Sequence, residues 1–427
     1  FISGCELVEE MPLLSPEVDY SERDMDSLLS AGKIDPYFEE FSIQDLDLVS
    51  YKINKLDKNN CFLLSQKDFD KIKSDVVFGD VGECARLEES INFNHTIIIN
   101  STNGFFLDCD GYEVTGNYNS SYFGIISIGN SIIKNCVVIK RAGNFLLMGE
   151  SKVYDSKAIG FFTHNGSWRP TGGFEVRDSS MVYNSIAENN QGGFSLEGTE
   201  IYNCSAINNS LGYQLFGEAR IYDSLAEENR EGYQTRHNAG IIDSIAKNNV
   251  YTGFQIGVGP GNQFATNCIA IGNPLGFFMG WEAVVSSSET QGGSVGFGVY
   301  ENSIVRDSTA LDSSQFGFDL NDFSIVENSF ARGNYYGVLA KDSSVLINMD
   351  SRQNIYRGLM AREDSQILSG KFCDNHQIIP DISSQGAYFE GYIRTSTIEG
   401  DYEGNPLILP CKKDIPIDVY PMIAKFK

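Results

Sequence analysis

The sequence predicts an all-β fold: a right-handed parallel β-helix solenoid of about 11–12 coils, with a small N-terminal cap that holds some helix and a C-terminal β cap. Three observations lead to this fold class. An Asn or Asp recurs at intervals near twenty residues, Ser or Cys usually follows it, and a Gly-aromatic pair often stands nine or ten residues further along. Such a period indicates a solenoid, and short β-like runs broken by Asn-Asn and Gly favour a β-helix over a leucine-rich repeat.

The recurring Asn or Asp defines the coils. It stands at Asn135, Asp155, Asn184, Asn203, Asp223, Asp243, Asn267, Asp307, Asn328 and Asn348. Successive coils of a β-helix pair about 4.8 Å apart, so equivalent residues stack in ladders. We expect Asn ladders to satisfy the turn amides, Ser and Cys to fill tight inward positions, and aromatic rings to stack inside the solenoid. The right hand follows from the usual twist and crossover of parallel strands.

The repeat does not cover the whole chain. We divide the sequence into an acidic arm at 1–35, an N-terminal cap at 36–80, the β-helix at 81–375 and a C-terminal cap at 376–427. In the N-terminal cap, Ser65 followed by Asp68 predicts the start of a short helix. Caps are expected because open solenoid ends expose strand edges.

Composition limits the partners. The net charge of −25 argues against nucleic acid, because such a surface repels phosphate. No run of about 18 apolar residues occurs, so we expect no transmembrane span. No motif requires a cofactor, and Ca²⁺ is the ion that an acidic surface attracts. A solvated acidic surface without a dedicated metal site is the alternative.

The nine cysteines form no CxxC pair, which argues against zinc or thioredoxin-like chemistry. Cys204 and Cys268 share a ladder position but lie three coils apart, roughly 14 Å, which exceeds disulfide reach. We therefore predict that these two, together with Cys136, are buried free thiols. The predicted disulfides are Cys84–Cys109 and Cys373–Cys411, one toward each end of the stack, and they fit an oxidising compartment.

Near the N-terminus, the segment ending in Gly4 and Cys5 is similar to a lipoprotein cleavage site, with Cys5 as the lipidated residue. A disulfide-bonded or free Cys5 in an extended arm is the alternative.

Two quoted stretches carry a family resemblance. "FFLDCDGYEVTGN" and "SIIKNCVVIK" resemble the opening coils of extracellular right-handed β-helix repeat proteins of the carbohydrate-binding and sugar-hydrolysis type, common in archaea and bacteria. Asp110 and Tyr112 stand where the family usually has Asn and His. The resemblance covers about residues 80–375. It implies the fold and an extracellular or cell-surface location, while the activity stays open among lyases, hydrolases, adhesins and surface layers.

Two intervals in the repeat are too long, those of 29 and 40 residues after Asp155 and Asn267. We expect them to contain loops at 163–175 and 279–298, which hold the two tryptophans of the chain. The predicted glycan-binding residues are Trp168, Arg169, Trp281 and Glu282. Exposed Trp stacks on sugar faces, whereas Arg and Glu bond to hydroxyls. The alternative is that each Trp covers apolar surface beneath its own loop.

Other candidate residues follow from chemistry alone. Candidate catalytic residues are Arg236, His237, Glu197 and Glu218, since a lyase needs a basic side chain and a hydrolase needs close carboxylates. His237 also fits an ordinary turn residue. Candidate Ca²⁺ ligands are Asp319, Asp322 and Asp342, and candidate glycosylation sites are Asn94, Asn100, Asn119 and Asn165.

No tight catalytic cluster stands out in the sequence, so we favour a non-enzymatic role. The predicted function is that of a secreted or cell-surface structural or adhesive protein, which assembles into a surface layer or filament through its arm and caps. It would bind a glycan or another cell-envelope component. The alternative is an enzyme, a polysaccharide lyase or glycoside hydrolase, acting in a groove between the loops at 163–175 and 279–298.

Overall fold

The computed structural model describes residues 61–72, 74–79, 84–116, 123–139, 143–160, 172–362, 365–373 and 375, and the backbone alone of strands at 49–50, 387–389, 394–400 and 402–403. The chain divides into two units, Phe1–Leu46 and Asp47–Lys427, and every described residue belongs to the second.

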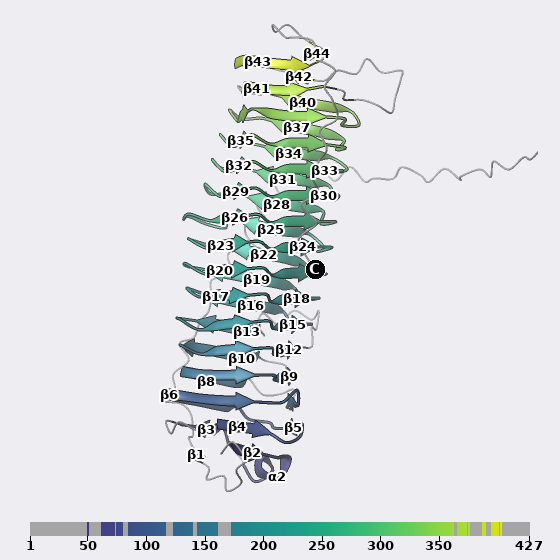
Figure 1. The fold of residues 1–427 in the computed structure, drawn as a ribbon. Helices are drawn as coiled ribbons and strands as arrows, with labels where there is room; N and C mark the ends of the chain where they lie inside the picture. Colours follow the sequence, from purple (N-terminus) through teal and green to yellow (C-terminus); the bar gives the residue numbers. More distant parts are fainter. Residues whose placement is uncertain are drawn as a thin grey trace, which may run out of the picture. The chain divides into compact units, whose positions relative to one another are not determined.

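The second unit is a right-handed parallel β-helix of about 14 turns, as predicted in fold class, hand and strand direction (Figure 1). Each regular coil contributes one strand to each of three parallel faces, which we call sheets A, B and C. The count of 11–12 coils was too low, because parallel pairing already joins strands that precede residue 81 and continues beyond residue 375.

The strands of sheet A are β1 (Val49–Ser50), β3 (Val76–Phe78), β10 (Gly143–Gly149), β13 (Gly172–Arg177), β16 (Gly192–Glu197), β19 (Leu211–Phe216), β22 (Glu231–Thr235), β25 (Thr252–Ile256), β28 (Leu275–Met279), β31 (Val295–Val299), β34 (Phe316–Leu320), β37 (Tyr336–Ala340), β40 (Arg357–Ala361), β42 (Ala387–Phe389) and β44 (Tyr402–Glu403). The long strands β6 (Ile97–Asp108) and β8 (Phe123–Lys134) run through sheets A and B.

Sheet B is formed by β2 (Phe62–Leu64), β4 (Cys84–Leu87), β11 (Lys152–Tyr154), β14 (Met181–Tyr183), β17 (Glu200–Tyr202), β20 (Arg220–Tyr222), β23 (Gly240–Ile242), β26 (Phe264–Thr266), β29 (Val284–Ser286), β32 (Ile304–Arg306), β35 (Ile325–Glu327) and β38 (Val345–Ile347). The strands β41 (Gln366–Phe372) and β43 (Arg394–Gly400) pair with one another, and β41 continues both sheets B and C.

Sheet C contains β5 (Ile91–Asn92), β7 (Glu113–Thr115), β9 (Val137–Ile139), β12 (Lys157–Ile159), β15 (Ile186–Glu188), β18 (Ser205–Ile207), β21 (Leu225–Glu227), β24 (Ile245–Lys247), β27 (Ile269–Ile271), β30 (Glu289–Gln291), β33 (Thr309–Leu311), β36 (Phe330–Arg332) and β39 (Met349–Arg352). The helix α2 (Gln66–Phe69) begins where predicted, because Ser65 caps it and the Asp68 carboxylate accepts a hydrogen bond from the Ser65 N–H at 3.0 Å.

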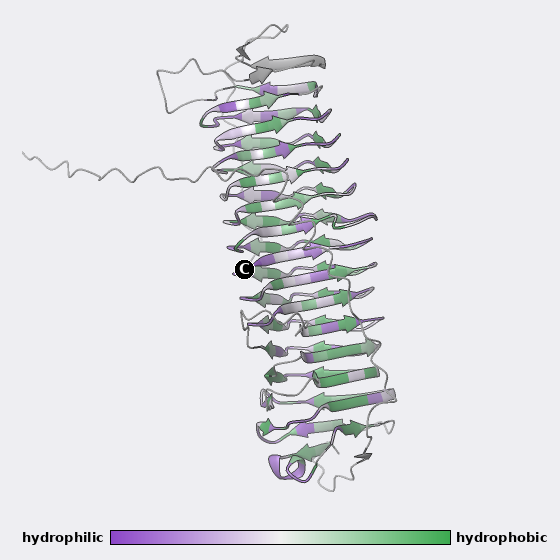
Figure 2. Ribbon diagram, turned by 180° about the vertical axis from the view of Figure 1, so that it is seen from behind, coloured by the Kyte–Doolittle hydropathy of each residue, from purple (hydrophilic) through white to green (hydrophobic). Residues whose placement is uncertain are grey.

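The interior is built from ladders, as the repeat predicts. Buried and more exposed residues alternate along most strands, because successive side chains point into and out of the coil. Figure 2 shows the hydropathy of the residues along these strands. Inside sheet A, rings stack continuously at 4.6–4.9 Å between centroids, with planes 3–9° apart. The rings are those of Phe145, Phe174, Phe194, Tyr213, Tyr233, Phe254, Phe277, Phe297 and Phe318. Each coil thereby buries the aromatic ring of its neighbour.

A buried amide ladder crosses the turns between sheets C and A. In each of Asn190, Asn209, Asn229 and Asn249, the backbone N–H donates to the side-chain oxygen of the next Asn, at 2.8–2.9 Å. The Asn229 amide also donates to the carbonyl of Ala206 at 2.9 Å. These bonds satisfy backbone groups that would otherwise be buried without partners.

The turns between sheets B and C explain the recurring Asn or Asp. Residues of this column adopt left-handed backbone angles, with φ of 49–56° in the coils from Asn135 to Asn348, a conformation that Asn and Asp tolerate better than most residues. Ser287 occupies the same position with φ of 49°. The interval of 40 residues after Asn267 is therefore two ordinary coils, so the predicted over-long loop at 279–298 is wrong.

The disulfides differ from the prediction. The structure pairs Cys61 with Cys84 and Cys109 with Cys136, at Cα separations of 4.6 and 4.7 Å. Cys84–Cys109 is wrong because Cys84 lies opposite Phe106 in sheet B. Cys136 is not free, since Cys109 in the preceding coil falls within disulfide reach.

The remaining cysteines are consistent with the ladder. Cys204 and Cys268 are buried free thiols, as predicted, and burial raises the pKa of each to about 12. Cys373 is disulfide-bonded, and its predicted partner Cys411 lies outside the described residues. Disulfides are typical of oxidising compartments.

Replacing Asn229 by Ala should destabilise the fold by about 2–4 kcal/mol, because it leaves buried donors of Asn209 and a buried carbonyl of Ala206 without partners. Urea denaturation measures this change. Ser205→Ala, on the outer side of sheet C, is the control and should stay within about 0.5 kcal/mol of the parent. Equal effects of the two substitutions would contradict a structural role of the amide ladder.

Candidate functional site

The outer side of sheet A carries a group of polar side chains on neighbouring coils. Strand pairing places Gly298 of β31 opposite Asp319 of β34, and Asp319 opposite Leu339 of β37. One residue beyond the last pairs of these strands stand Tyr300, Asn321 and Lys341, also pointing outward. Two columns of outward residues thus run side by side across three coils.

Tyr300, Asp319 and Lys341 form the centre of this group. The Tyr300 hydroxyl donates to the Asp319 carboxylate at 3.4 Å, and the Asn321 amide donates to its other oxygen at 3.4 Å. The Lys341 ammonium lies 3.9 Å from the Asp319 carboxylate. A phenol, a carboxylate and an ammonium group therefore meet on one regular sheet, each held by a different coil. We call Tyr300, Asp319 and Lys341 the outer cluster.

Gly298 makes the contact between Tyr300 and Asp319 feasible. A Cβ atom at this position would lie 3.0 Å from Cε2 and 3.5 Å from the hydroxyl of Tyr300. The Tyr300 ring therefore folds back over Gly298 toward Asp319. On its other side the ring contacts Phe278 of β28, with centroids 5.3 Å apart and planes tilted by 37°.

Burial shifts the pKa of both acidic groups of the outer cluster. The Asp319 side chain is 16% exposed. Burial raises the pKa of Asp319, and Lys341, Tyr300 and Asn321 oppose this shift in part. The pKa of Tyr300 lies well above its ordinary value because of burial and the negative charges of Asp319 and Asp322. Tyr300 is thus a protonated phenol beside a carboxylate that holds its proton more tightly than usual.

Aromatic residues border this part of sheet A on both edges. At the edge where the chain enters from sheet C, the rings of Phe316 and Tyr336 stack at 5.2 Å, and those of Tyr335 and Tyr356 stack at 5.5 Å. Arg357 lies over Tyr356 at 5.0 Å. At the opposite edge, Trp281 and Phe323 are exposed.

The candidate catalytic residues from the sequence do not meet. Glu218 and His237 are exposed turn residues, and His237 has φ of 60°, which agrees with its interpretation as a turn residue. Glu197 is exposed and pairs with Phe216 in the next coil. The guanidinium of Arg236, one coil further, lies over the Phe216 ring at 5.6 Å. Phe216 therefore separates Glu197 from Arg236.

The predicted glycan-binding loops are only partly described. The extra residues after Asp155 fall between β12 and β13, where sheet C leads into sheet A, and they include Trp168 and Arg169, which lie outside the described residues. Trp281 and Glu282 form a turn between sheets A and B instead. Because residues 279–298 form ordinary strands and turns of the β-helix, the predicted groove between two loops is not formed as proposed.

The three candidate metal ligands also separate. Asp319 belongs to the outer cluster, whereas Asp322 and Asp342 take left-handed positions in successive turns, with φ of 52° and 50°. Within the described ranges, no group of three or more His, Cys, Asp or Glu side chains lies together as a metal site would require. The predicted Ca²⁺ group is therefore not assembled from these three aspartates.

Several predictions stay untested. Asn94 and Asn100 are exposed, as glycosylation requires, whereas Asn119, Asn165 and Cys5 lie outside the described residues. In the described part of the chain, no helix is long and apolar enough to cross a membrane.

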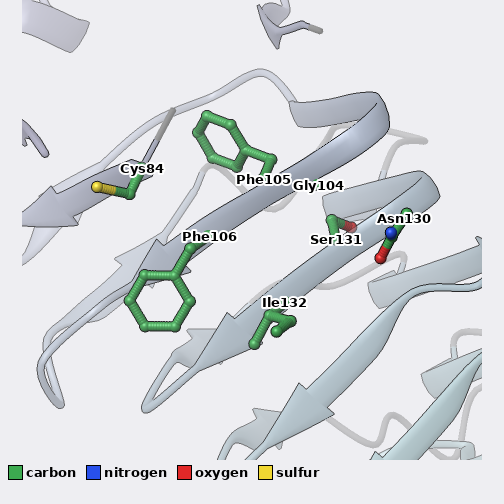
Figure 3. A pocket seen from close by; sticks show the side chains of 7 residues that line it. All are labelled: Cys84, Gly104, Phe105, Phe106, Asn130, Ser131 and Ile132. Atoms are coloured by element: carbon green, nitrogen blue, oxygen red, sulfur yellow. The ribbon is translucent and has the colours of Figure 1, made fainter. Parts of the chain in front are cut away.

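A pocket of about 210 Å³ lies elsewhere, over strands β4, β6 and β8 (Figure 3). It is lined by Cys84, Gly104, Phe105, Phe106, Asn130, Ser131 and Ile132. Cys84 is oxidised, and no Asp, Glu, His, Lys or Arg is among the lining residues. The pocket therefore lacks the acid or base that catalysis would need.

Sequence reasoning missed Tyr300 and Gly298. The signal was available in the Gly-aromatic step: aligning Gly296-Phe297 with Gly317-Phe318 places Gly298 beside Asp319 and Tyr300 beside Asn321. In the next coil, Val338 takes the place of the aromatic residue after Gly337. The Gly-aromatic pair is therefore absent there, and the sequence does not show that Lys341 aligns with Tyr300 and Asn321.

The fold and its ladders define the chain as a right-handed parallel β-helix protein, which confirms the resemblance at the level of the fold. No protein-family model matches the sequence, and no curated protein matches it. Similar solved structures include pectate lyase Pel9A, with 18% identity, a TM-score of 0.37, and coverage of 49% of this chain and 67% of that one.

Two further similar structures are carbohydrate-active enzymes. The A-module of mannuronan C-5 epimerase AlgE4 of Azotobacter vinelandii has 14% identity and a TM-score of 0.32, covering 75% of this chain and 91% of that one. The catalytic domain of a GH87 α-1,3-glucanase has 12% identity and a TM-score of 0.31, covering 71% and 64%. At these values the likeness carries no functional argument, so function must be inferred from the outer cluster itself.

Asp319→Asn should stabilise the protein at neutral pH. Because the folded state raises the pKa of Asp319, the wild-type protein loses stability as pH rises from the ordinary Asp pKa to the raised one. The amide has no charge to bury, so the variant should gain over the wild type near pH 7 and lose that advantage near pH 3.5. Urea denaturation at both pH values measures the difference. An identical difference at the two pH values would show that burial does not govern this carboxylate.

Proposed function

We propose that the chain is a secreted polysaccharide lyase that binds an acidic glycan across sheet A and cleaves it by β-elimination at the outer cluster. The observation that carries the proposal is the contact between the Tyr300 hydroxyl, the Asp319 carboxylate and the Lys341 ammonium on the outside of a regular sheet. Perturbed acidic groups of this kind concentrate at functional sites. The disulfides support an extracytoplasmic location.

The composition of the neighbouring strands favours an acidic substrate. The five sheet-A strands from β28 to β40 contain Asp319 as their single carboxylate and Arg357 as their single cation. Lys341 and Arg362 directly follow β37 and β40. The adjoining turns also hold carboxylates, at Glu301, Asp322 and Asp342. Lys341, however, lies in the outer cluster itself, and this supports recognition of a uronate carboxylate, whose charge Lys341 would neutralise.

The presence of a single carboxylate in these five strands favours elimination over hydrolysis. Glycoside hydrolysis normally uses a pair of carboxylates on either side of the scissile bond. The outer cluster instead offers a proton acceptor, a proton donor and a cation, which are the groups that elimination requires. The enzymatic alternative therefore has more support than the structural or adhesive role that we favoured from the sequence.

The proposed reaction starts at the carbon next to the uronate carboxyl group. Asp319 takes the proton from this carbon, the electrons form a carbon–carbon double bond, and the bond to the glycosidic oxygen breaks. Tyr300, which its raised pKa keeps protonated, donates its proton to the departing oxygen. The proton on Asp319 then returns to Tyr300 through their hydrogen bond, and both groups are restored.

Tyr300→Phe and Lys341→Met should each lower turnover of the acidic polysaccharide by about 100-fold or more, because each removes one proton-transfer or charge-neutralising group. The assay follows the ultraviolet absorbance of the unsaturated uronate end with pectate and mannuronan as substrates, and reducing ends with α-1,3-glucan. Lys247→Met, on the distant sheet C, is the control and should retain activity. If the products are all saturated, the reaction is hydrolysis and not elimination. If the uronate is inverted without cleavage of the chain, the reaction is epimerisation.

Gly298→Val should lower kcat by about 100-fold while the protein remains folded, since the side chain displaces the Tyr300 ring from Asp319. The backbone at Gly298 is an ordinary strand, so the effect arises from contact with Tyr300. The double variant with Tyr300→Phe should lose little more than either single variant. Additive losses would show that Gly298 acts independently of Tyr300.

A further inference from the structure

The turns that lead from sheet A to sheet B contain an unexpected pair of aromatic residues. In four successive coils these turns place two residues in the left-handed region: Trp281-Glu282, Glu301-Asn302, Asp322-Phe323 and Asp342-Ser343, with φ between 50° and 61°. Turns with two left-handed residues strongly favour Gly, Asn and Asp. A bulky ring at such a position is disfavoured, so Trp281 and Phe323 oppose the local backbone.

Neither ring is buried in the fold, so burial does not offset the backbone strain. Trp281 is 48% exposed and Phe323 is 62% exposed. Among the described residues, neither stacks on another ring, in contrast to Phe316, Tyr335, Tyr336 and Tyr356 at the opposite edge. The Trp281 turn is instead fixed through its backbone N–H, which donates to the Glu301 carboxylate at 3.1 Å. Strained residues that contribute little to folding tend to occur at ligand sites.

Their position relates them to the outer cluster. Trp281 follows β28, the strand of Phe278, and Phe323 follows β34, the strand of Asp319. The coil between them supplies Tyr300, so their turns are two coils apart, roughly 10 Å. The two rings therefore stand on the same edge of sheet A, on either side of the coil that supplies the phenol.

We propose that Trp281 and Phe323 are binding platforms for sugar rings of the polysaccharide along the edge of sheet A beside the outer cluster. This inference rests on the proposed function and adds the residues that hold the chain of sugars along the edge of sheet A. An aromatic face binds the C–H groups of a pyranose ring while the sugar hydroxyls remain in water, so an exposed ring suits this ligand.

The test uses binding and stability together, because a binding platform predicts opposite changes in the two. In a Tyr300→Phe background, Trp281→Asn and Phe323→Gly should each weaken binding of the polysaccharide that the wild type cleaves by about five- to tenfold. The same substitutions should raise the Tm by about 1–2 °C, because Asn and Gly suit the left-handed backbone. Titration calorimetry with pectate, mannuronan and α-1,3-glucan measures the affinity, and thermal unfolding measures the Tm.

Ser343→Gly is the matched control. Ser343 stands one coil further along at the position equivalent to Phe323, with φ of 61°. The Ser343→Gly variant should show the same rise in Tm as Phe323→Gly, while its affinity for the polysaccharide should stay unchanged. The inference is overturned if the aromatic variants bind as tightly as their parent, or if their Tm falls, which would assign the rings to folding.

Two other outcomes identify what has failed. If sedimentation shows a wild-type dimer that Phe323→Gly converts to a monomer without loss of polysaccharide affinity, the rings belong to an interface between copies and the inference is wrong. If the wild type neither binds nor cleaves any of the three polysaccharides, the proposed function fails and this inference falls with it. Cleavage by the wild type together with unchanged affinity in the aromatic variants overturns the platforms alone.

Discussion

Parallel pairing between successive coils holds each residue about 4.8 Å from its counterpart in the next coil. The buried Asn ladder fixes this register at the turn from sheet C to sheet A, where the backbone N–H of one coil donates to the side chain of the next. The inner aromatic stack depends on the same register, since its rings are nearly parallel. A coil that slipped by one residue would lose both ladders and turn its apolar residues toward water.

The outer side of sheet A follows the register that the inward ladders set. Outward residues are free to vary in chemistry as long as the inward ladders persist, and this freedom allows a phenol, a carboxylate and an ammonium group to stand on three consecutive coils. Gly298 illustrates the difference between the two sides. On the inside a missing side chain would leave a cavity, whereas on the outside it provides the space over which Tyr300 reaches Asp319.

The sequence was sufficient for the fold class, the inner ladders and the free thiols Cys204 and Cys268, because these follow directly from a period and an inward-facing residue type. It was insufficient where one residue breaks the pattern. Ser287 replaces Asn or Asp in the turn and concealed a complete coil, which led to a loop that does not exist. The outer cluster was missed because its three residues differ in type from coil to coil, and only the pairing of β31, β34 and β37 places Tyr300, Asp319 and Lys341 in contact.

The two buried thiols have a consequence for the dynamics of the solenoid. Cys204 and Cys268 lie three coils apart in one ladder, and each Sγ donates to a backbone carbonyl of its own turn at 3.3 Å. Repeat proteins are stabilised mainly by contacts between neighbours, so adjoining coils are able to separate locally. A thiol-modifying reagent would reach each cysteine only during such an opening. The wild-type chain therefore contains two native reporters, whose relative labelling rates would show whether the middle coils open one at a time or as a single cooperative block.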